Sequence, residues 1–169
     1  MKKAVMIIAP ENFRDEEFFE PKEVLEGCGV EVKVASINLD LAVGKLGAKV
    51  KPDILLEDVR AKDFDAVIFV GGTGSKIYFD DQQAHNLARE ALKEGRIVAA
   101  ICIAPLILAR AGILKDRRAT VFSSEEKELK ELGAEYSGRP VEKDGFIITA
   151  AGPFAATEFG REIAKALKE

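Results

Sequence analysis

Apolar residues along the chain gather in short runs that are separated by patterns with helical spacing. Runs rich in valine, isoleucine and alanine predict strands over residues 4–9, 30–36, 65–72 and 97–102. Several of these runs are continuously apolar rather than alternating, as expected of parallel strands that are covered on both faces. We therefore expect a mostly parallel sheet with helices packed on both sides.

Helical patterns lie between and after the strands, over residues 18–28, 82–94, 104–111, 124–132 and 153–168. This alternation implies βαβ units joined by right-handed crossovers. A short strand pair is predicted within residues 42–56, and a hairpin turning at Asp144-Gly145 within residues 134–150. The predicted architecture is a three-layer α/β sandwich of flavodoxin-like type, with residues 1–169 forming a single domain.

Composition and charge narrow the class of protein. Apolar residues make up 47% of the 169 and charged residues 32%, which indicates a folded chain with a substantial core. The net charge is −4, so there is no basic excess to neutralise phosphates, and we expect no nucleic-acid partner.

Two apolar segments resemble export or membrane signals. The N-terminal run ends at Pro10 after about six residues, which is too short for a signal peptide. Residues 97–114 are long enough to cross a bilayer, but Pro105 and Arg110 interrupt them, so we predict a buried strand that runs into a buried helix. We expect a cytoplasmic protein with no membrane partner.

The two cysteines fall in different predicted elements, and we expect both to be free. Cys28 lies near a helix end, where a structural role is expected. With one histidine and no Cys/His cluster, no metal site is expected. The acidic run at residues 15–17 follows the first strand and would repel the phosphate of FMN, so no cofactor is expected either.

Cys102 stands where an apolar strand ends and a helix of small residues begins. Ligands bind outside the carboxyl ends of strands in open α/β sheets, and a nucleophile on such a sharp turn is exposed to them. Backbone N–H groups at the helix start are expected to lower the pKa of this thiol. The alternative is a small buried apolar residue.

Two further features follow strands. Gly71-Gly72 lets the backbone approach a ligand, and the N–H of Gly72, with that of Ile103, can hold an oxyanion. The alternative is a tight turn that needs glycine. The carboxylates of Asp15, Glu16 and Glu17 can be functional or can simply favour the start of a helix.

These features, in this order and spacing, resemble the ThiJ/PfpI superfamily, which contains protein deglycases, glyoxalase III-type enzymes and PfpI-type peptidases. The resemblance rests on AAICIAP around Cys102, on the paired glycines, on Glu17 four residues before Pro21 and on VEKDGFIITAAGP near the C-terminus. It implies a fold like that of class I glutamine amidotransferases and a homodimer or larger homo-oligomer. It also implies Cys102 as nucleophile, Glu17 as acid/base, and the N–H groups of Gly72 and Ile103 as the oxyanion site.

One departure from the family pattern concerns histidine. Peptidase-like members have histidine directly after the cysteine, where this chain has Ile103, and the deglycase branch has one at the position that we align with Phe122. The only histidine, His85, lies on the predicted helix 82–94 and is expected at the surface or an interface. The general base of a Cys–His pair is therefore absent.

A protonated Glu17 can donate a hydrogen bond to the Cys102 thiolate and then protonate a carbonyl oxygen. We therefore expect an enzyme of deglycase or glyoxalase III type that acts on small α-oxoaldehydes, such as methylglyoxal, or on glycated groups. One alternative is a redox-responsive stress protein with an oxidisable Cys102. Others are a PfpI-like cysteine peptidase, which Ile103 disfavours, and a binding protein that has lost the family's activity.

Overall fold

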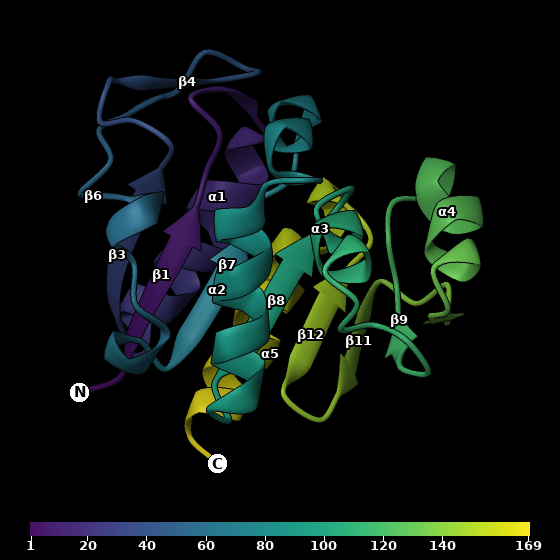
Figure 1. Ribbon diagram of the computed structural model, residues 1–169. Helices are drawn as coiled ribbons and strands as arrows, with labels where there is room; N and C mark the ends of the chain where they lie inside the picture. The colour runs from purple at the N-terminus through teal and green to yellow at the C-terminus, as the bar shows by residue number, and fades with distance from the viewer.

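The computed structural model describes all of residues 1–169, and its centre is a seven-stranded sheet in the order β11-β12-β8-β7-β1-β3-β6 (Figure 1). Six strands run parallel, and only β11, at one edge, is antiparallel to its neighbour. The flavodoxin-like α/β fold is thus confirmed. The strand bounds are β1 (Lys3–Ile7), β3 (Glu31–Ser36), β6 (Ile54–Leu55), β7 (Ala66–Phe69), β8 (Ile97–Ile101), β11 (Val141–Asp144) and β12 (Ile147–Ala150).

Helices cover both faces of this sheet (Figure 1). One face carries α1 (Asp15–Gly27) and α5 (Ala156–Leu167), and the other carries α2 (Gln82–Lys93) and α3 (Pro105–Arg110), with α4 (Glu126–Glu131) beside α3. Because successive side chains of a strand point to opposite faces, Val5 and Ile7 of β1 join one apolar core while Ala4 and Met6 join the other. This is why the strand runs are continuously apolar.

Two small sheets flank the main one. β2 (Glu11–Phe13), β4 (Ala42–Gly44) and β5 (Lys49–Val50) form one of them, and β4 and β5 are the strand pair predicted within residues 42–56. β9 (Arg118–Ala119) and β10 (Glu135–Tyr136) form the other, in parallel. Five 3-10 helices complete the chain: η1 (Leu56–Asp58), η2 (Ala61–Asp63), η3 (Thr73–Tyr78), η4 (Ser123–Glu125) and η5 (Pro153–Ala155).

The predicted hairpin of residues 134–150 is confirmed only for its second half. β11 and β12 pair up to Asp144 and Ile147, so Gly145-Phe146 form the connection rather than Asp144-Gly145. Gly145 supplies the left-handed conformation there, with φ +61°. Residues 135–136 form β10, which pairs with β9, a strand outside the hairpin.

Helix α1 begins at Asp15, earlier than predicted, and contains Pro21 in its interior. Residues 97–114 form β8 and the short α3, as predicted, and none of the helices has the length and apolarity that crossing a membrane requires.

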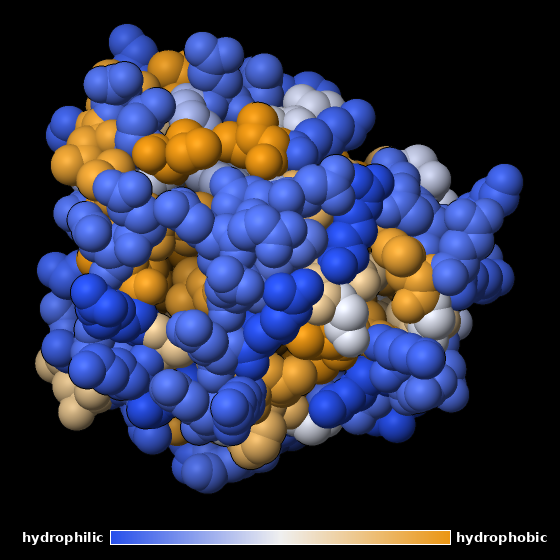
Figure 2. Space-filling model, in the orientation of Figure 1, coloured by the Kyte–Doolittle hydropathy of each residue, from blue (hydrophilic) through white to orange (hydrophobic).

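Exposed apolar side chains gather around β4, among them Leu39, Leu41, Val43 and Leu46. Figure 2 shows apolar residues near the top of a mostly hydrophilic face, where Figure 1 places β4. The homo-oligomer expected from the family resemblance stays a prediction.

Helices α1 and α5 approach each other closely at Gly160. A Cβ atom at this position would lie 2.8 Å from Pro21 Cα and 3.2 Å from Val24 Cβ. We expect Gly160→Ala to lower the free energy of unfolding by about 1–3 kcal/mol, although alanine is the better helix former. Gly27→Ala, with no atom within 4 Å of the added carbon, is the control for urea unfolding. Equal stability of Gly160→Ala and wild type would contradict the close packing.

Candidate active site

Cys102 directly follows β8 and adopts a left-handed conformation with φ +66°, which is rare for a residue with a side chain. Such a conformation costs on the order of 1–3 kcal/mol and persists only where the surroundings enforce it. Here the Cys102 N–H donates to the Ala150 carbonyl at 2.9 Å, and the Phe122 N–H donates to the Cys102 carbonyl at 2.8 Å. Two neighbouring segments thus fix the sharp turn that the sequence predicted.

Glu17 and Cys102 meet at Gly71. Glu17 lies in the first turn of α1 with 0% of its surface exposed, and neither carboxyl oxygen has a hydrogen-bond partner of ordinary geometry. A Cβ atom on Gly71 would overlap Glu17 Oε1 and would lie 2.7 Å from Cys102 Cβ. The Gly71 carbonyl accepts a 3.0 Å hydrogen bond from the Arg14 N–H, which ties the start of α1 to the end of β7.

The three acidic residues at the start of α1 have three different environments, and none caps the helix. Asp15 accepts hydrogen bonds from the N–H groups of Leu46 and Ala48 at 2.9 and 3.0 Å. Glu16 forms a salt bridge with Arg14 at 2.9 Å. All three carboxyl groups lie in the first turn of α1, where negative charge favours a helix start, and only Glu17 also faces the thiol.

Burial governs the ionisation of both groups. It raises the pKa of Glu17 to about 8, against a smaller lowering by Cys102 and Arg14. Burial, followed by the charge of Glu17, raises the pKa of Cys102 to about 12. The predicted lowering of the thiol pKa is therefore wrong, because the backbone N–H groups of Gly72 and Ile103 lower it by less than burial and Glu17 raise it.

The backbone N–H groups of Gly72 and Ile103 lower the pKa of the Cys102 thiol, and both residues line the same cavity as the sulfur. Their role as an oxyanion site stays a prediction. Gly72 has φ +97°, and a Cβ atom there would lie 2.5 Å from Arg14 N and from Asn12 O. Glycine is thus required at this position for both conformation and space.

Cys102, Glu17, Gly72 and Ile103 line one cavity of about 340 Å³, so the structure brings all four predicted site residues together. Sequence reasoning missed the rest of the lining: Arg14, Lys45, Thr73, Lys76, Ser124, Glu125 and Pro153. Lys76 could have been found, because it follows the paired glycines closely. Lys45 could not, because it comes from the connection between β4 and β5, whose position no local pattern indicates. Phe122 lines the cavity where the family resemblance led us to align a histidine.

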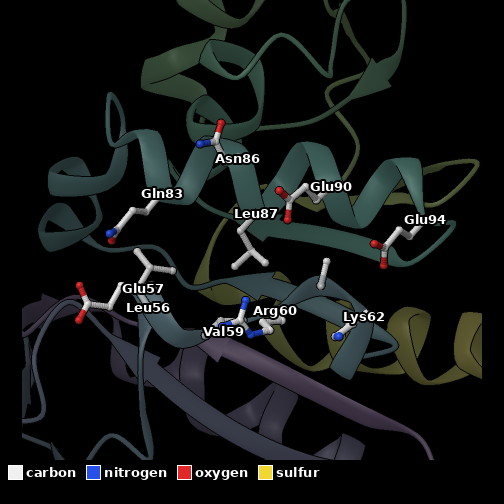
Figure 3. Close-up of a pocket in the computed structure, with 11 residues that line it drawn as sticks. Leu56, Glu57, Val59, Arg60, Lys62, Gln83, Asn86, Leu87, Glu90 and Glu94 are labelled. Carbon is white, nitrogen blue, oxygen red and sulfur yellow. The ribbon is translucent and has the colours of Figure 1, made fainter.

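A larger cavity of about 440 Å³ lies between α2 and the η1–η2 segment (Figure 3). Its lining contains carboxylates, amides and the basic Arg60 and Lys62, but no cysteine, histidine, serine or threonine. It holds no nucleophile of those types, so we place the candidate site at Cys102. No group of three or more histidine, cysteine or acidic side chains comes together to hold a metal.

One expectation outside the site is wrong. His85 is buried, with 4% of its surface exposed, and its Nε2 lies 2.6 Å from the Phe79 carbonyl oxygen, because it faces inward from α2. It lines neither of the two cavities described above. Cys28 lies at the end of α1, as predicted, and its side chain is exposed; a structural role for it stays a prediction. Both cysteines are free, as predicted.

Comparisons with known proteins identify the family. The sequence profile of the DJ-1/PfpI family matches residues 2–166. An uncharacterized protein of Methanocaldococcus jannaschii is 44% identical over 170 residues, covering 99% of this chain and 83% of that protein. Deglycase PfpI of Pyrococcus furiosus is 32% identical over 97% of this chain and 99% of its own length.

Among solved structures, a ThiJ/PfpI domain protein from Brachyspira murdochii superposes with a TM-score of 0.96 at 35% identity, over 98% of this chain and 96% of that one. A profile that spans nearly the whole chain, supported by these relatives, shows that this protein belongs to the DJ-1/PfpI family.

Proposed function

We propose that this protein is a cysteine-dependent enzyme that acts on small α-oxoaldehydes or glycated groups, with Cys102 as nucleophile and Glu17 as acid/base. The observation that carries the proposal is the buried Glu17 carboxyl group beside the thiol, in a cavity large enough for a small carbonyl compound. The name of the P. furiosus relative, a deglycase, supports the same reaction class.

The reactive form in this proposal holds one proton between the two groups. With the pKa of Glu17 raised to about 8 and that of Cys102 to about 12, loss of the first proton leaves a carboxylate at Glu17 and a neutral thiol. The reactive form arises when the thiol passes its proton to Glu17, because the thiolate is the nucleophile and the protonated carboxyl group is the acid.

Attack on an aldehyde then follows from the geometry. The thiolate sulfur forms a bond to the aldehyde carbon, and the C=O π electrons move to oxygen, which takes the proton of Glu17. The product is a hemithioacetal beside a carboxylate. For methylglyoxal, this carboxylate can carry the proton on the former aldehyde carbon to the neighbouring carbon, while the hydroxyl proton of the hemithioacetal passes to the ketone oxygen, which yields a lactoyl thioester. Water hydrolyses that thioester to lactate and restores the thiol.

Peptide hydrolysis fits the site less well. The leaving amine must be protonated, and in a Cys–His pair the histidine supplies that proton. Here Ile103 and Phe122 stand where histidines are found in the two branches of the family, and His85 lies outside the cavity.

The test is conversion of methylglyoxal to lactate by the wild-type protein, by Cys102→Ala and by Cys28→Ala. We expect Cys102→Ala to lose all turnover above the uncatalysed rate, while Cys28→Ala retains it because its side chain is exposed away from the core. Equal turnover by wild type and Cys102→Ala would overturn the proposal. Absent turnover combined with selective peroxide oxidation of Cys102 would favour the redox-responsive alternative.

A further inference from the structure

The cavity at Cys102 carries a surplus of positive charge that the reaction proposed above does not use. Arg14, Lys45 and Lys76 line it, and apart from Glu17 the only acidic residue in its lining is Glu125. Arg14 is neutralised by Glu16, but neither lysine forms a salt bridge. The surplus is local, because the chain as a whole has a net charge of −4.

The backbone next to Lys45 is held in place by the buried carboxylate of Asp15. Asp15 accepts hydrogen bonds from the N–H groups of Leu46 and Ala48, which follow Lys45 in the connection between β4 and β5. The Lys45 N–H itself donates to the Phe13 carbonyl at 2.9 Å. The backbone that carries this lysine is thus fixed on both sides.

The backbone at Lys76 belongs to the short helix η3, which begins directly after Gly72. In this helix the Ser75 hydroxyl donates to the Gly72 carbonyl at 2.7 Å and the Ser75 N–H donates to it at 3.0 Å. Other parts of the lining, Ile103, Phe122 and Pro153, are apolar. The lining therefore contains both cations and apolar groups.

We propose that Lys45 and Lys76 form an anion subsite, which makes the cavity selective for carbonyl compounds that also carry a carboxylate or a phosphate. The carbonyl part rests on the proposed function, whereas the anion subsite rests on the two unpaired lysines alone. Both lysine side chains are exposed and form no salt bridge, so these two cations attract an anion to the cavity that they line and raise its local concentration there.

Two alkylating agents of nearly equal size test the subsite without any catalytic turnover. Iodoacetate is an anion and iodoacetamide is neutral, and in both cases the thiolate sulfur bonds to the CH₂ carbon while iodide leaves with the electron pair. The measured quantity is the iodoacetate/iodoacetamide rate ratio at Cys102 divided by the same ratio at Cys28, from peptide mass mapping at pH 8.5. Cys28 is exposed and corrects for the intrinsic reactivity of each agent.

We expect the double variant Lys45→Gln/Lys76→Gln to lower this normalised ratio roughly three- to tenfold, as the loss of two nearby charges at the edge of solvent requires. Added salt should lower it in wild type as well. Lys49→Gln is the matched control, because Lys49 lies in the same small sheet but does not line the cavity. A ratio that is unchanged in the double variant, or lowered as much by Lys49→Gln, would overturn the subsite.

Competition distinguishes the two anions. Inorganic phosphate and acetate are added during alkylation by iodoacetamide, with sodium chloride at matched ionic strength as reference. Stronger protection of Cys102 by phosphate assigns the subsite to phosphorylated carbonyls, and protection by acetate that is at least as strong assigns it to carboxylates. Protection by neither contradicts the subsite. None of these readouts requires turnover. A protein that fails to convert methylglyoxal can still have the anion subsite, and a protein that converts methylglyoxal can lack it.

Discussion

Glu17→Gln is expected to lower kcat/KM for methylglyoxal by about 10²–10⁴-fold while Cys102 remains open to alkylation. Glutamine has the shape of a protonated glutamic acid and can donate a hydrogen bond to the thiolate, but it cannot give a proton to the carbonyl oxygen or take one back. Turnover and thiol reactivity should therefore separate in this variant. Steady-state turnover and timed alkylation with iodoacetamide measure the two effects on the same sample.

The pH dependence locates the proton of the pair. The first proton leaves near the raised pKa of Glu17, about 8, and the thiol pKa itself is raised to about 12. Because that first loss leaves the charge on Glu17, which raises the pKa of the thiol, alkylation of wild-type Cys102 is expected to stay low up to pH 10. Glu17→Gln lacks this charge and is expected to be alkylated faster. Alkylation of wild type that rises through pH 8 would instead place the first charge on sulfur.

The same carboxyl group makes stability depend on pH. Its pKa rises from the ordinary 4.5 to about 8 on folding, so between these values the folded protein binds more protons than the unfolded chain. The free energy of unfolding then falls as pH rises from about 4.5 to 8. Glu17→Gln lacks this loss, and its stability relative to wild type should increase over that window. Urea unfolding at pH 5 and pH 8.5 measures the difference.

Gly71→Ala is expected to reduce turnover by more than tenfold and to lower the free energy of unfolding by about 1–3 kcal/mol. The new methyl group would overlap the Glu17 carboxyl group and would lie 2.5 Å from the Ile101 carbonyl oxygen and 2.7 Å from Cys102 Cβ. Gly71 is not among the glycines with positive φ, so the effect comes from space rather than from backbone strain. The collision forces apart the two groups that must share a proton.

Gly27→Ala serves again as the control, since its added carbon meets nothing within 4 Å. Methylglyoxal turnover, urea unfolding and Cys102 alkylation are compared across wild type and the two variants. Turnover of Gly71→Ala within twofold of wild type would show that close contact between Glu17 and Cys102 is not needed. A loss of stability without a loss of turnover would restrict Gly71 to a role in packing.

The sequence by itself determined most of the fold. The continuously apolar runs identify β1, β7 and β8, because strands covered on both faces need apolar side chains at every position. Local patterns also located the candidate site at the ends of these strands. Cys102, Gly72 and Ile103 were predicted from the place where each strand stops, which is where a parallel sheet presents its loops. Glu17 lies in the acidic run that follows the first strand, and the family resemblance singled it out.

Tertiary structure alone decided the properties that depend on distant segments. The thiol pKa is raised rather than lowered because burial beside Glu17 outweighs two backbone N–H groups. His85 turned out to be buried because residues packed around α2 cover it, which its own helix pattern does not reveal. Lys45 reaches the cavity because Asp15, 30 positions earlier in the chain, fixes the connection between β4 and β5. The pKa of a group and the exposure of a side chain depend on all residues that lie near it in space, whereas a sequence shows only the residues that are near it along the chain.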